Sequence, residues 1–325
     1  MEINVLILSA GRRVELISCF QDAAKKLGLK SSVIAADCSA TAPALYFADK
    51  KYVIPRIDSG NYIQAIIEIC KKEDISLVIP TIDTELLILS ENKTVIESST
   101  KAKVLISSKQ VIDICRNKLN TQVFLEDNGF LMPELYSYEE IDQHEMEYPL
   151  FIKPSDGSSS INTYKINNKD ELTFYMNRVP NPMIQRFMDG EEYTVDAFSD
   201  FDGNVIHVVP RKRIATRSGE VSKGKIIKDR AIIEDVKNLL NILKPVGQVT
   251  IQCIKSKMGI VYIEINPRFG GGAPMSIKAG ADSCRNLYRL LSGEKLTYNE
   301  DYHDNLTFLR FDSSISINDD MELVQ

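Results

Sequence analysis

Glu264-Ile-Asn266-Pro-Arg268 ends a strongly apolar run of the sequence and leads directly into Phe269-Gly-Gly-Gly272. Residues 247–254 alternate apolar and polar side chains, residues 260–265 are apolar except for Glu264, and a short turn segment separates the two runs. This pattern is typical of two antiparallel strands joined by a turn. The sequence therefore predicts a β-hairpin whose last strand delivers the Glu-x-Asn-Pro-Arg segment.

The side chains of this segment can form a metal and phosphate site. Side chains two positions apart share one face of a strand, so Glu264 and Asn266 point the same way, and Gln252 on the facing strand joins them. A carboxylate and two amide oxygens are the hard donors that Mg²⁺ prefers. Arg268 adds a planar cation that matches phosphate or carboxylate oxygens. A hairpin with a merely solvated polar face is the alternative, and it explains the Asn-Pro-Arg turn and the glycines poorly.

A lysine at the end of another apolar run marks a second candidate site. Pro149-Leu-Phe-Ile-Lys153-Pro154 is followed by a loop of small and polar residues at 155–160. Backbone N–H groups and hydroxyls of such a loop can wrap phosphate oxygens while the ammonium supplies charge. The chain has no G-x-x-x-x-G-K-[ST] motif, so this segment is not a P-loop. Taken alone, it could equally be the tip of a mobile hairpin.

A third segment, residues 183–195, has the pattern of a strand, an acidic turn and another strand. Its backbone groups could meet the edge of an adenine ring, and Glu192 could accept hydrogen bonds from ribose hydroxyls. An ordinary strand–turn–strand with solvated acids explains the same pattern. A nucleotide-binding role for residues 183–195 therefore depends on the two sites described above.

The first third of the chain alternates short apolar runs with amphipathic helical patterns, which predicts βαβ units and a doubly wound parallel sheet. Polar loops at 9–13, 37–41 and 81–85 follow three of these runs. They would share the carboxyl edge of the sheet, where open α/β sheets bind ligands. Their charged residues are candidates for ligand binding, with helix capping or simple solvation as the alternative. They are Arg12, Asp37, Asp83 and Glu85.

From about residue 120 the pattern changes to short strand-like runs separated by glycine and asparagine turns. Asp200-Phe-Asp-Gly203 has the composition of a hairpin turn between the runs at 193–199 and 205–210. We expect this part of the chain to form antiparallel sheet with interspersed helices. The tail after residue 312 is expected to be poorly ordered.

Composition and charge argue against several classes of protein. Apolar residues make up 44% and charged residues 26% of the 325 residues, as in ordinary soluble globular proteins. The formal net charge of −6 disfavours nucleic-acid binding, which usually needs a clustered basic face. No leader-like N-terminus and no apolar run of roughly 20 residues occurs, so a membrane protein is not expected. The six scattered cysteines, without a C-x-x-C pair, predict buried thiols in a reducing cytoplasm.

Taken in order, these segments resemble the ATP-grasp superfamily, and most closely the ATP-grasp halves of the carbamoyl-phosphate synthase large subunit. The resemblance rests on Lys118, then Ile152-Lys153-Pro154 with its serine-rich loop, then 185–192, then Gln252, then 264–268. The N-terminal third resembles the preATP-grasp domain, so the likeness extends to about residue 310. The implied divisions are a preATP-grasp α/β domain at 1–117, an ATP-grasp lid subdomain at 118–187, a C-terminal subdomain with the metal site at 188–312, and a tail at 313–325.

The resemblance also implies roles for individual residues, with ATP and Mg²⁺ as cofactors and Mn²⁺ as a substitute for Mg²⁺. Arg268 and Lys153 would act on the transferred phosphoryl group. The metal ligands would be Gln252, Glu264 and, assisting them, Asn266. The nucleotide would be held by Lys118, Lys153, Asp156, Gly157, Ser158, Ser159, Ser160, Gln185, Phe187, Met188 and Glu192. Arg211 and Arg213 match a basic stretch that often faces substrate, and we expect Arg12, Asp83 and Glu85 of the N-terminal domain to bind substrate as well.

The implied reaction is formation of an amide or peptide bond from small-molecule carboxylate and amine substrates through an acylphosphate. Gln185 stands where the family often has an acid, and the phosphate loop ends in Ser-Ser-Ile-Asn rather than in glycines. The chain has one ATP-grasp unit where the synthase has two, so carbamoyl phosphate synthesis is not expected. A homodimer is suggested by the family alone.

Three other functions remain open from the sequence. A catalytically silent nucleotide-binding regulator would keep the fold without the chemistry, but the expected metal ligands, both lysines and Arg268 are all present. A kinase-like carboxylate phosphorylation would stop at the acylphosphate. An NAD-dependent oxidoreductase is suggested only by the first βα unit, and Ser9-Ala-Gly-Arg-Arg13 lacks the G-x-G-x-x-G fingerprint.

Overall fold

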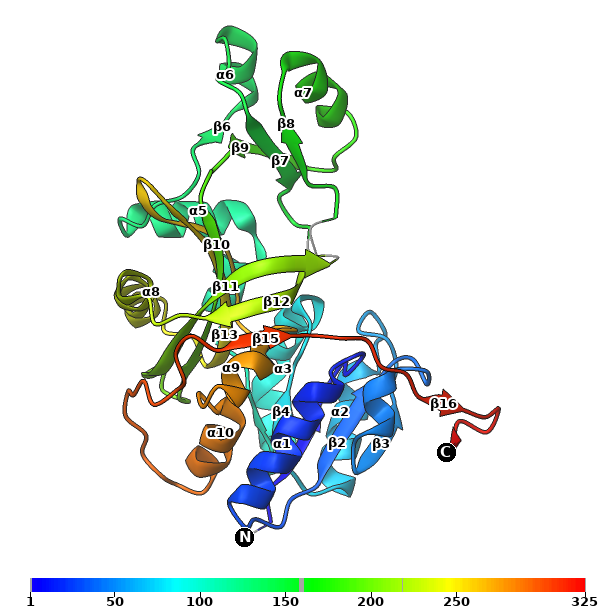
Figure 1. Ribbon diagram of the computed structural model, residues 1–325. Coiled ribbons are helices and arrows are strands. Elements are labelled where there is room, and N and C mark those ends of the chain that lie inside the picture. The colour runs from blue at the N-terminus through cyan, green and yellow to red at the C-terminus, as the bar shows by residue number, and fades with distance from the viewer. Residues whose placement is uncertain (1, 158–160, 218, 325) are drawn as a thin grey trace.

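The computed structural model of the chain describes residues 2–157, 161–217 and 219–324, which form three parts arranged along the molecule (Figure 1). A parallel sheet with its helices lies at one end, a small antiparallel sheet lies at the other, and a six-stranded sheet lies between them. Both chain termini lie at the end that holds the parallel sheet (Figure 1).

The N-terminal part is a doubly wound α/β domain, as the sequence predicts. Its five parallel strands have the order β3-β2-β1-β4-β5, and apolar clusters cover both faces of the sheet. The edge strand β3 was not predicted, because its sequence Lys-Lys-Tyr-Val is mostly exposed and contains no apolar run. The elements are β1 (Asn4–Ile7), α1 (Val14–Lys26), β2 (Val33–Asp37), η1 (Pro43–Tyr46), β3 (Lys50–Val53), α2 (Tyr62–Lys72), β4 (Ile75–Ile79), η2 (Asp83–Glu85), α3 (Leu86–Ser99), β5 (Lys103–Val104) and α4 (Lys109–Arg116).

The small antiparallel sheet has the order β6-β9-β7-β8 and its own apolar cluster. This sheet carries Lys153 at the end of β7 and Gln185 near the end of β9. Helix α5 comes before the sheet but packs elsewhere, because its buried Leu125 belongs to the core of the six-stranded sheet. The elements are α5 (Lys118–Asp127), β6 (Leu135–Tyr136), α6 (Tyr138–Gln143), β7 (Leu150–Pro154), β8 (Tyr164–Ile166), α7 (Lys169–Met176) and β9 (Pro182–Arg186).

The central sheet has the order β14-β13-β10-β11-β12-β15 and is antiparallel throughout. The two predicted hairpins are confirmed, since β10 pairs with β11 across residues 200–203 and β13 pairs with β14. Helix α8 packs against one face of the sheet, and its apolar stripe joins the core there. The elements are β10 (Glu191–Ser199), β11 (Val205–Arg217), β12 (Glu220–Ile226), α8 (Arg230–Leu243), β13 (Gly247–Ser256), β14 (Gly259–Asn266), α9 (Ala273–Lys278), α10 (Ser283–Leu291) and β15 (Thr307–Leu309).

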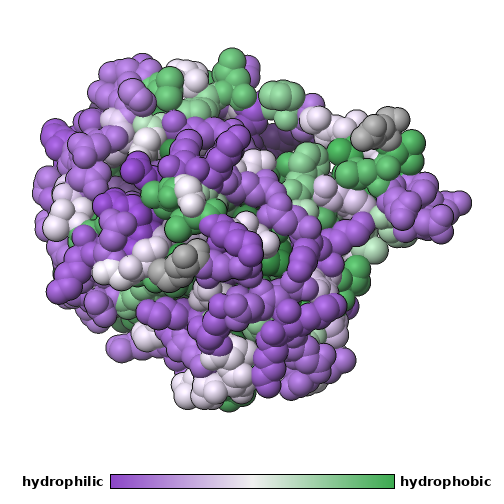
Figure 2. Space-filling view, turned by 90° about the horizontal axis from the view of Figure 1, so that it is seen from below, coloured by the Kyte–Doolittle hydropathy of each residue, from purple (hydrophilic) through white to green (hydrophobic). Residues whose placement is uncertain are grey.

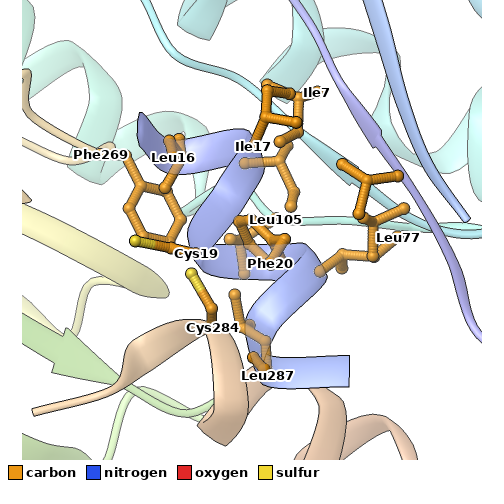
Figure 3. Packing of buried hydrophobic residues seen from close by; sticks show 14 of the residues in the cluster. Ile7, Leu16, Ile17, Cys19, Phe20, Leu77, Leu105, Phe269, Cys284 and Leu287 are labelled. Atoms are coloured by element: carbon orange, nitrogen blue, oxygen red, sulfur yellow. The ribbon is translucent and has the colours of Figure 1, made fainter. Parts of the chain in front are cut away.

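The N-terminal domain shares a core with the segment that follows β14. Phe20 of α1 meets the rings of Phe269 and Tyr288 edge to face, at centroid distances of 5.9 and 6.0 Å. Figure 3 shows Phe269 and Cys284 packed against Leu16, Cys19 and Phe20. Edge-to-face aromatic pairs are favourable beyond the area that they bury. This packing fixes the residues next to Phe269 against the N-terminal domain.

The tail after residue 312 has more structure than the sequence predicts. β16 (Ser316–Ile317) and β17 (Leu323–Val324) form a small hairpin, and Lys51 of β3 donates to the carbonyl oxygen of Met321 at 2.8 Å. The tail leaves β15 and runs across to the N-terminal domain (Figure 1). The view from below shows mostly hydrophilic residues, with apolar residues in smaller patches between them (Figure 2).

Candidate active site

One face of the six-stranded sheet is polar because the side chains of its strands alternate. On β10, Tyr193, Val195 and Ala197 are buried in the core that the sheet shares with α8. Thr194 and Asp196 therefore lie on the opposite face. The same alternation on β11, β13 and β14 brings the polar residues of four strands together on that face.

A row of these residues crosses the face in register. Arg211 of β11 pairs with Thr194 of β10, which pairs in turn with Gln252 of β13. Gln252 pairs with Glu264 of β14, so these two side chains face each other as predicted. The register shifts directly after Gln252, which places a β-bulge beside the site. Such bulges are common next to active sites, where they re-aim side chains.

Glu264, Asn266 and Gln252 form the oxygen-donor group that the sequence predicts. Asn266 Nδ2 donates to Glu264 Oε1 at 2.5 Å, and no Lys or Arg among the described residues forms an ion pair with Glu264. Residues 2–157, 161–217 and 219–324 contain no cluster of three or more His, Cys, Asp or Glu side chains that could hold a metal. One unpaired carboxylate with amide oxygens fits Mg²⁺, which usually keeps several waters and shares nucleotide phosphates.

Two lysines lie close to this group. Lys153 is only 4% exposed, and burial lowers the pKa of its ammonium to about 8, with a further lowering by Lys118 that Glu264 opposes. Burial also lowers the pKa of Lys118, whose ammonium donates to the carbonyl oxygen of Gly157. Two desolvated ammonium groups without a carboxylate ion-pair partner in the described structure are suited to an anionic ligand.

A cavity of about 200 Å³ lies between the small sheet and the central sheet. Most of the predicted nucleotide-binding residues line it, whereas Asp156 is exposed and does not. Ser158, Ser159 and Ser160 lie outside the described residues. The predicted residues that line the cavity are Lys118, Lys153, Gly157, Gln185, Phe187, Met188, Glu192, Arg213, Gln252 and Glu264.

A second cavity of about 290 Å³ lies between the central sheet and the N-terminal domain. It shares Arg213, Gln252 and Glu264 with the first cavity. Arg213 links the two, because its Nε lies 3.3 Å from Glu192 Oε2 and its Nη1 lies 3.5 Å from Gln252 Oε1. The two cavities therefore meet at the oxygen-donor group.

Charged side chains line the second cavity and are held by partners. Arg211 is 1% exposed, and Asp196 accepts from its Nε and Nη2 at 3.2 and 3.0 Å. Arg211 Nη1 is buried without a hydrogen-bond partner among the described residues. Arg13 lies 3.4 Å from Glu220, and burial lowers the pKa of its guanidinium. A buried donor without a partner costs free energy, so the Nη1 group of Arg211 favours an oxyanion beside it.

The glycines after Arg268 allow these side chains to approach the backbone. A Cβ atom at Gly271 would lie 2.6 Å from both Arg13 Nη1 and Glu220 Oε1. A Cβ atom at Gly272 would lie 2.6 Å from Arg211 Nη2. The Phe-Gly-Gly-Gly segment is therefore required by close packing around the charged cavity.

Arg268 is held by the N-terminal domain. Its Nε and Nη2 donate to the carboxylate of Asp83 at 2.9 and 2.5 Å. Both residues line the second cavity, so the structure brings these two predicted site residues together.

The other two predicted substrate-binding residues of the N-terminal domain, Arg12 and Glu85, lie outside both cavities. Arg12 is exposed and does not line either cavity, whereas its neighbour Arg13 lines the second. Glu85 is fully buried and accepts hydrogen bonds from Ser9, Tyr62 and two backbone N–H groups. Burial raises the pKa of Glu85, and the hydrogen bonds oppose that effect. Neither Arg12 nor Glu85 lines the two cavities, so their role in substrate binding stays a prediction, and Glu85 holds loops of the sheet edge together.

Sequence reasoning missed Arg13, Glu220 and Thr250 of the second cavity. Thr250 could have been found from strand alternation, because it precedes Gln252 by two residues on β13. Arg13 and Glu220 are 207 residues apart in the chain, and no local pattern links them.

Among the cysteines, Cys38 is exposed and the other five are buried. Within the described ranges, no helix has both the length and the apolar character needed to cross a membrane.

Two segments of the chain match known protein families. Residues 5–105 match the PylC-like N-terminal domain, and residues 115–272 match the ATP-grasp domain. D-alanine–D-alanine ligase of Bacillus anthracis is 26% identical over 239 residues, which are 68% of this chain and 77% of that protein. Carbamoyl-phosphate synthase of Methanobrevibacter smithii is 20% identical over 265 residues, which are 76% of this chain and 70% of that protein.

A solved structure shows the same fold over almost the whole chain. It is the biotin carboxylase domain of the Hydrogenobacter thermophilus 2-oxoglutarate carboxylase, solved with MgADP, ADP and bicarbonate. The TM-score is 0.73 at 17% identity, covering 93% of this chain and 73% of that one. The chain therefore carries a PylC-like N-terminal domain at 5–105, followed by an ATP-grasp domain at 115–272.

Proposed function

We propose that this protein is an ATP-dependent carboxylate–amine ligase that forms an amide or peptide bond through an acylphosphate. The observation that carries the proposal is the meeting of the two cavities at Arg213, Gln252 and Glu264. A nucleotide in the first cavity would direct its terminal phosphate toward a substrate in the second. The ligase relatives form bonds of this kind, which supports the same chemistry here.

The first cavity is suited to a nucleotide. Phe187 and Met188 offer apolar surface for a base, and Glu192 lies where its carboxylate can accept from a ribose. Lys118 and Lys153 supply positive charge for the phosphates. Gln252, Glu264 and Asn266 would hold Mg²⁺, which lowers the negative charge felt at the phosphoryl group. Mn²⁺ prefers the same oxygen donors and is expected to substitute.

The second cavity is suited to a carboxylate. Arg211 and Arg13 supply buried positive charge, and Arg268 lies at the junction with the donor group. These guanidinium groups would orient the carboxylate and stabilise charge on the phosphoryl group during transfer. Asp83 keeps Arg268 in place for that role.

The reaction would then proceed in two balanced steps. A carboxylate oxygen attacks the terminal phosphorus of ATP, the bond to the bridging oxygen breaks, and ADP leaves with that electron pair. The amine then attacks the acyl carbon, inorganic phosphate leaves, and the amine proton passes to solvent. Alignment and exclusion of water would supply much of the rate enhancement, as is usual for phosphoryl transfer.

An assay for ADP release with pooled carboxylates and amines tests the proposal. We expect ADP only when both kinds of substrate are present, together with one amide product for each ADP. ADP release that depends on the carboxylate alone, does not change when amines are added and gives no amide would instead indicate carboxylate phosphorylation alone. Nucleotide binding without ADP release under any pairing would indicate a regulator, and either result would contradict the ligase proposal.

We further propose that the partners are small molecules, with neither nucleic acid nor membrane involved, and that the protein acts in the cytoplasm as a homodimer. The net charge of −6 and the buried thiols support this setting.

A further inference from the structure

Two buried glutamines lie behind the nucleotide cavity. Gln122 of α5 and Gln185 of β9 are each 1% exposed. Gln185 Nε2 donates to Gln122 Oε1 at 2.7 Å and to the carbonyl oxygen of Pro133 at 3.4 Å. A buried amide must be hydrogen-bonded or it costs free energy, so this contact fixes how Gln185 is held.

The direction of these hydrogen bonds is set by groups that can only accept. Gln122 Nε2 donates to Glu126 Oε1 at 2.6 Å and to the carbonyl oxygen of Pro133 at 2.9 Å. A carboxylate and a peptide carbonyl have no proton to donate, so the NH₂ group of Gln122 must face them. Its oxygen is then left to accept from Gln185. Rotating either amide by 180° would set oxygen against oxygen.

These hydrogen bonds determine which end of the Gln185 amide faces the first cavity. With its NH₂ group turned toward Gln122 and Pro133, the amide of Gln185 directs its oxygen the other way. Gln185 lines the first cavity beside Phe187, and no donor among the described residues contacts its oxygen. A base in this cavity would therefore meet a fixed hydrogen-bond acceptor.

We propose that Gln122 is a positioning residue that locks Gln185 as an acceptor and so makes the protein select a purine with a 6-amino group over one with a 6-oxo group. The inference rests on the proposed function, in which a nucleotide occupies the first cavity. Adenine would donate its amino proton to Gln185. Hypoxanthine or guanine would set a carbonyl oxygen against the amide oxygen, and the lock prevents the amide from turning to accommodate it.

Binding of ATP, ITP and purine riboside triphosphate to the whole protein tests this inference without any knowledge of the other substrates. The third nucleotide has hydrogen at position 6, so it loses the hydrogen bond without opposing two acceptors. We expect Kd to rise in the order ATP, purine riboside triphosphate, ITP. ITP should bind about tenfold more weakly than ATP, as is typical when a buried polar group loses its partner.

Gln122→Met removes the lock and nearly preserves side-chain volume. With Gln185 free to turn, the ratio of the ITP and ATP dissociation constants should fall to about twofold. Gln64→Met is the matched control, because Gln64 of α2 donates to Glu68 four residues later at 2.9 Å, as Gln122 does to Glu126, but on the surface. The Gln64→Met protein should have the same ratio of ITP and ATP dissociation constants as the wild type.

Glu126→Ala provides a second variant on an exposed residue, should Gln122→Met fail to fold. It removes one of the two acceptors that orient Gln122, so the ratio of the ITP and ATP dissociation constants should fall by about threefold. ATP binding with unchanged selectivity in the folded Gln122→Met protein, or in Glu126→Ala if only that variant folds, would overturn the inference and leave the ligase proposal standing. A wild-type protein that binds none of the three nucleotides would overturn both.

Discussion

Arg268, the last residue of the Glu264–Arg268 segment, forms a two-point ion pair with Asp83, which lies 185 positions earlier in the N-terminal domain. The side chains are 13% and 10% exposed, so the pair is largely shielded from solvent. Bidentate pairs of this kind fix orientation as well as charge. The N-terminal domain thus completes the site by setting the direction of the arginine next to the proposed metal ligands.

Asp83→Ala should lower turnover and leave nucleotide binding unchanged. Without its partner, Arg268 loses its fixed orientation, and we expect ADP release to slow by at least about tenfold, or about 1.4 kcal/mol in the barrier. Asp83 does not line the first cavity, so the Kd for ATP should stay within about twofold. Asp312→Ala, which removes the exposed partner of Arg217, is the control. Wild-type turnover in Asp83→Ala would show that this contact has no role in the reaction.

Arg13→Ala and Arg12→Ala form a matched pair of neighbouring substitutions. Arg13 lines the second cavity beside Glu220, whereas Arg12 is exposed. Removing the Arg13 charge should raise KM for the carboxylate substrate by about tenfold, because a charged hydrogen bond is lost. Arg12→Ala should behave as the wild type. Steady-state kinetics at saturating ATP would decide, and equal KM values for the two variants would argue against a substrate in this cavity.

Gly271→Ala tests the same cavity without removing a charge. The added methyl group would lie 2.6 Å from both members of the Arg13–Glu220 pair, so the pair must shift. We expect KM for a second-cavity substrate to rise about fivefold or more, with an unchanged Kd for ATP. Gly60→Ala is the control, because nothing lies within 4 Å of its Cβ position. If the two variants have the same KM, the close approach at Gly271 does not shape the site.

Because His207 is buried, we expect the free energy of unfolding to fall at acid pH. It is 2% exposed and stacks on Phe198, and burial lowers the pKa of its imidazole to about 3. The unfolded pKa is about 6.5, so the folded state favours neutral histidine, and this contribution is complete above pH 6.5 and is lost as the pH falls toward 3. At pH 5 the loss is about 2 kcal/mol of unfolding free energy.

Urea unfolding at pH 7.5 and pH 5.0 measures this loss. His207→Met should lose about 2 kcal/mol less than the wild type between the two pH values, whatever its stability at pH 7.5. His144→Gln, at an exposed histidine, should follow the wild type. An equal loss in His207→Met and the wild type would show that His207 does not titrate with unfolding.

The parts of the site that local rules govern could be predicted from the sequence. A strand has a period of two and a short turn fixes register, so the facing of Gln252 and Glu264 follows from their positions. The loops at the edge of the parallel sheet also meet as expected, since Gly11 N donates to Asp37 at 2.8 Å.

What could not be predicted depends on where a side chain turns within a loop or on contacts between distant segments. Arg12 and Arg13 are neighbours at the start of a helix, and only the loop conformation decides which enters the cavity. In the sequence, Glu85 cannot be told from a solvated loop residue, because the four donors to its carboxylate come together only in the fold. Arg13 contacts Glu220 only because the N-terminal domain packs against the central sheet.

The rate of Mg²⁺-dependent ADP release by Glu264→Ala tests the central claim most directly. Glu264 is the one carboxylate among the proposed ligands and belongs to both cavities. We predict a fall of at least about 100-fold at saturating Mg²⁺ and substrates, since removal of a metal ligand forfeits charge stabilisation in the transition state. Glu234→Ala, at an exposed residue of α8, should keep the wild-type rate. A Glu264→Ala protein that releases ADP at the wild-type rate would contradict the account.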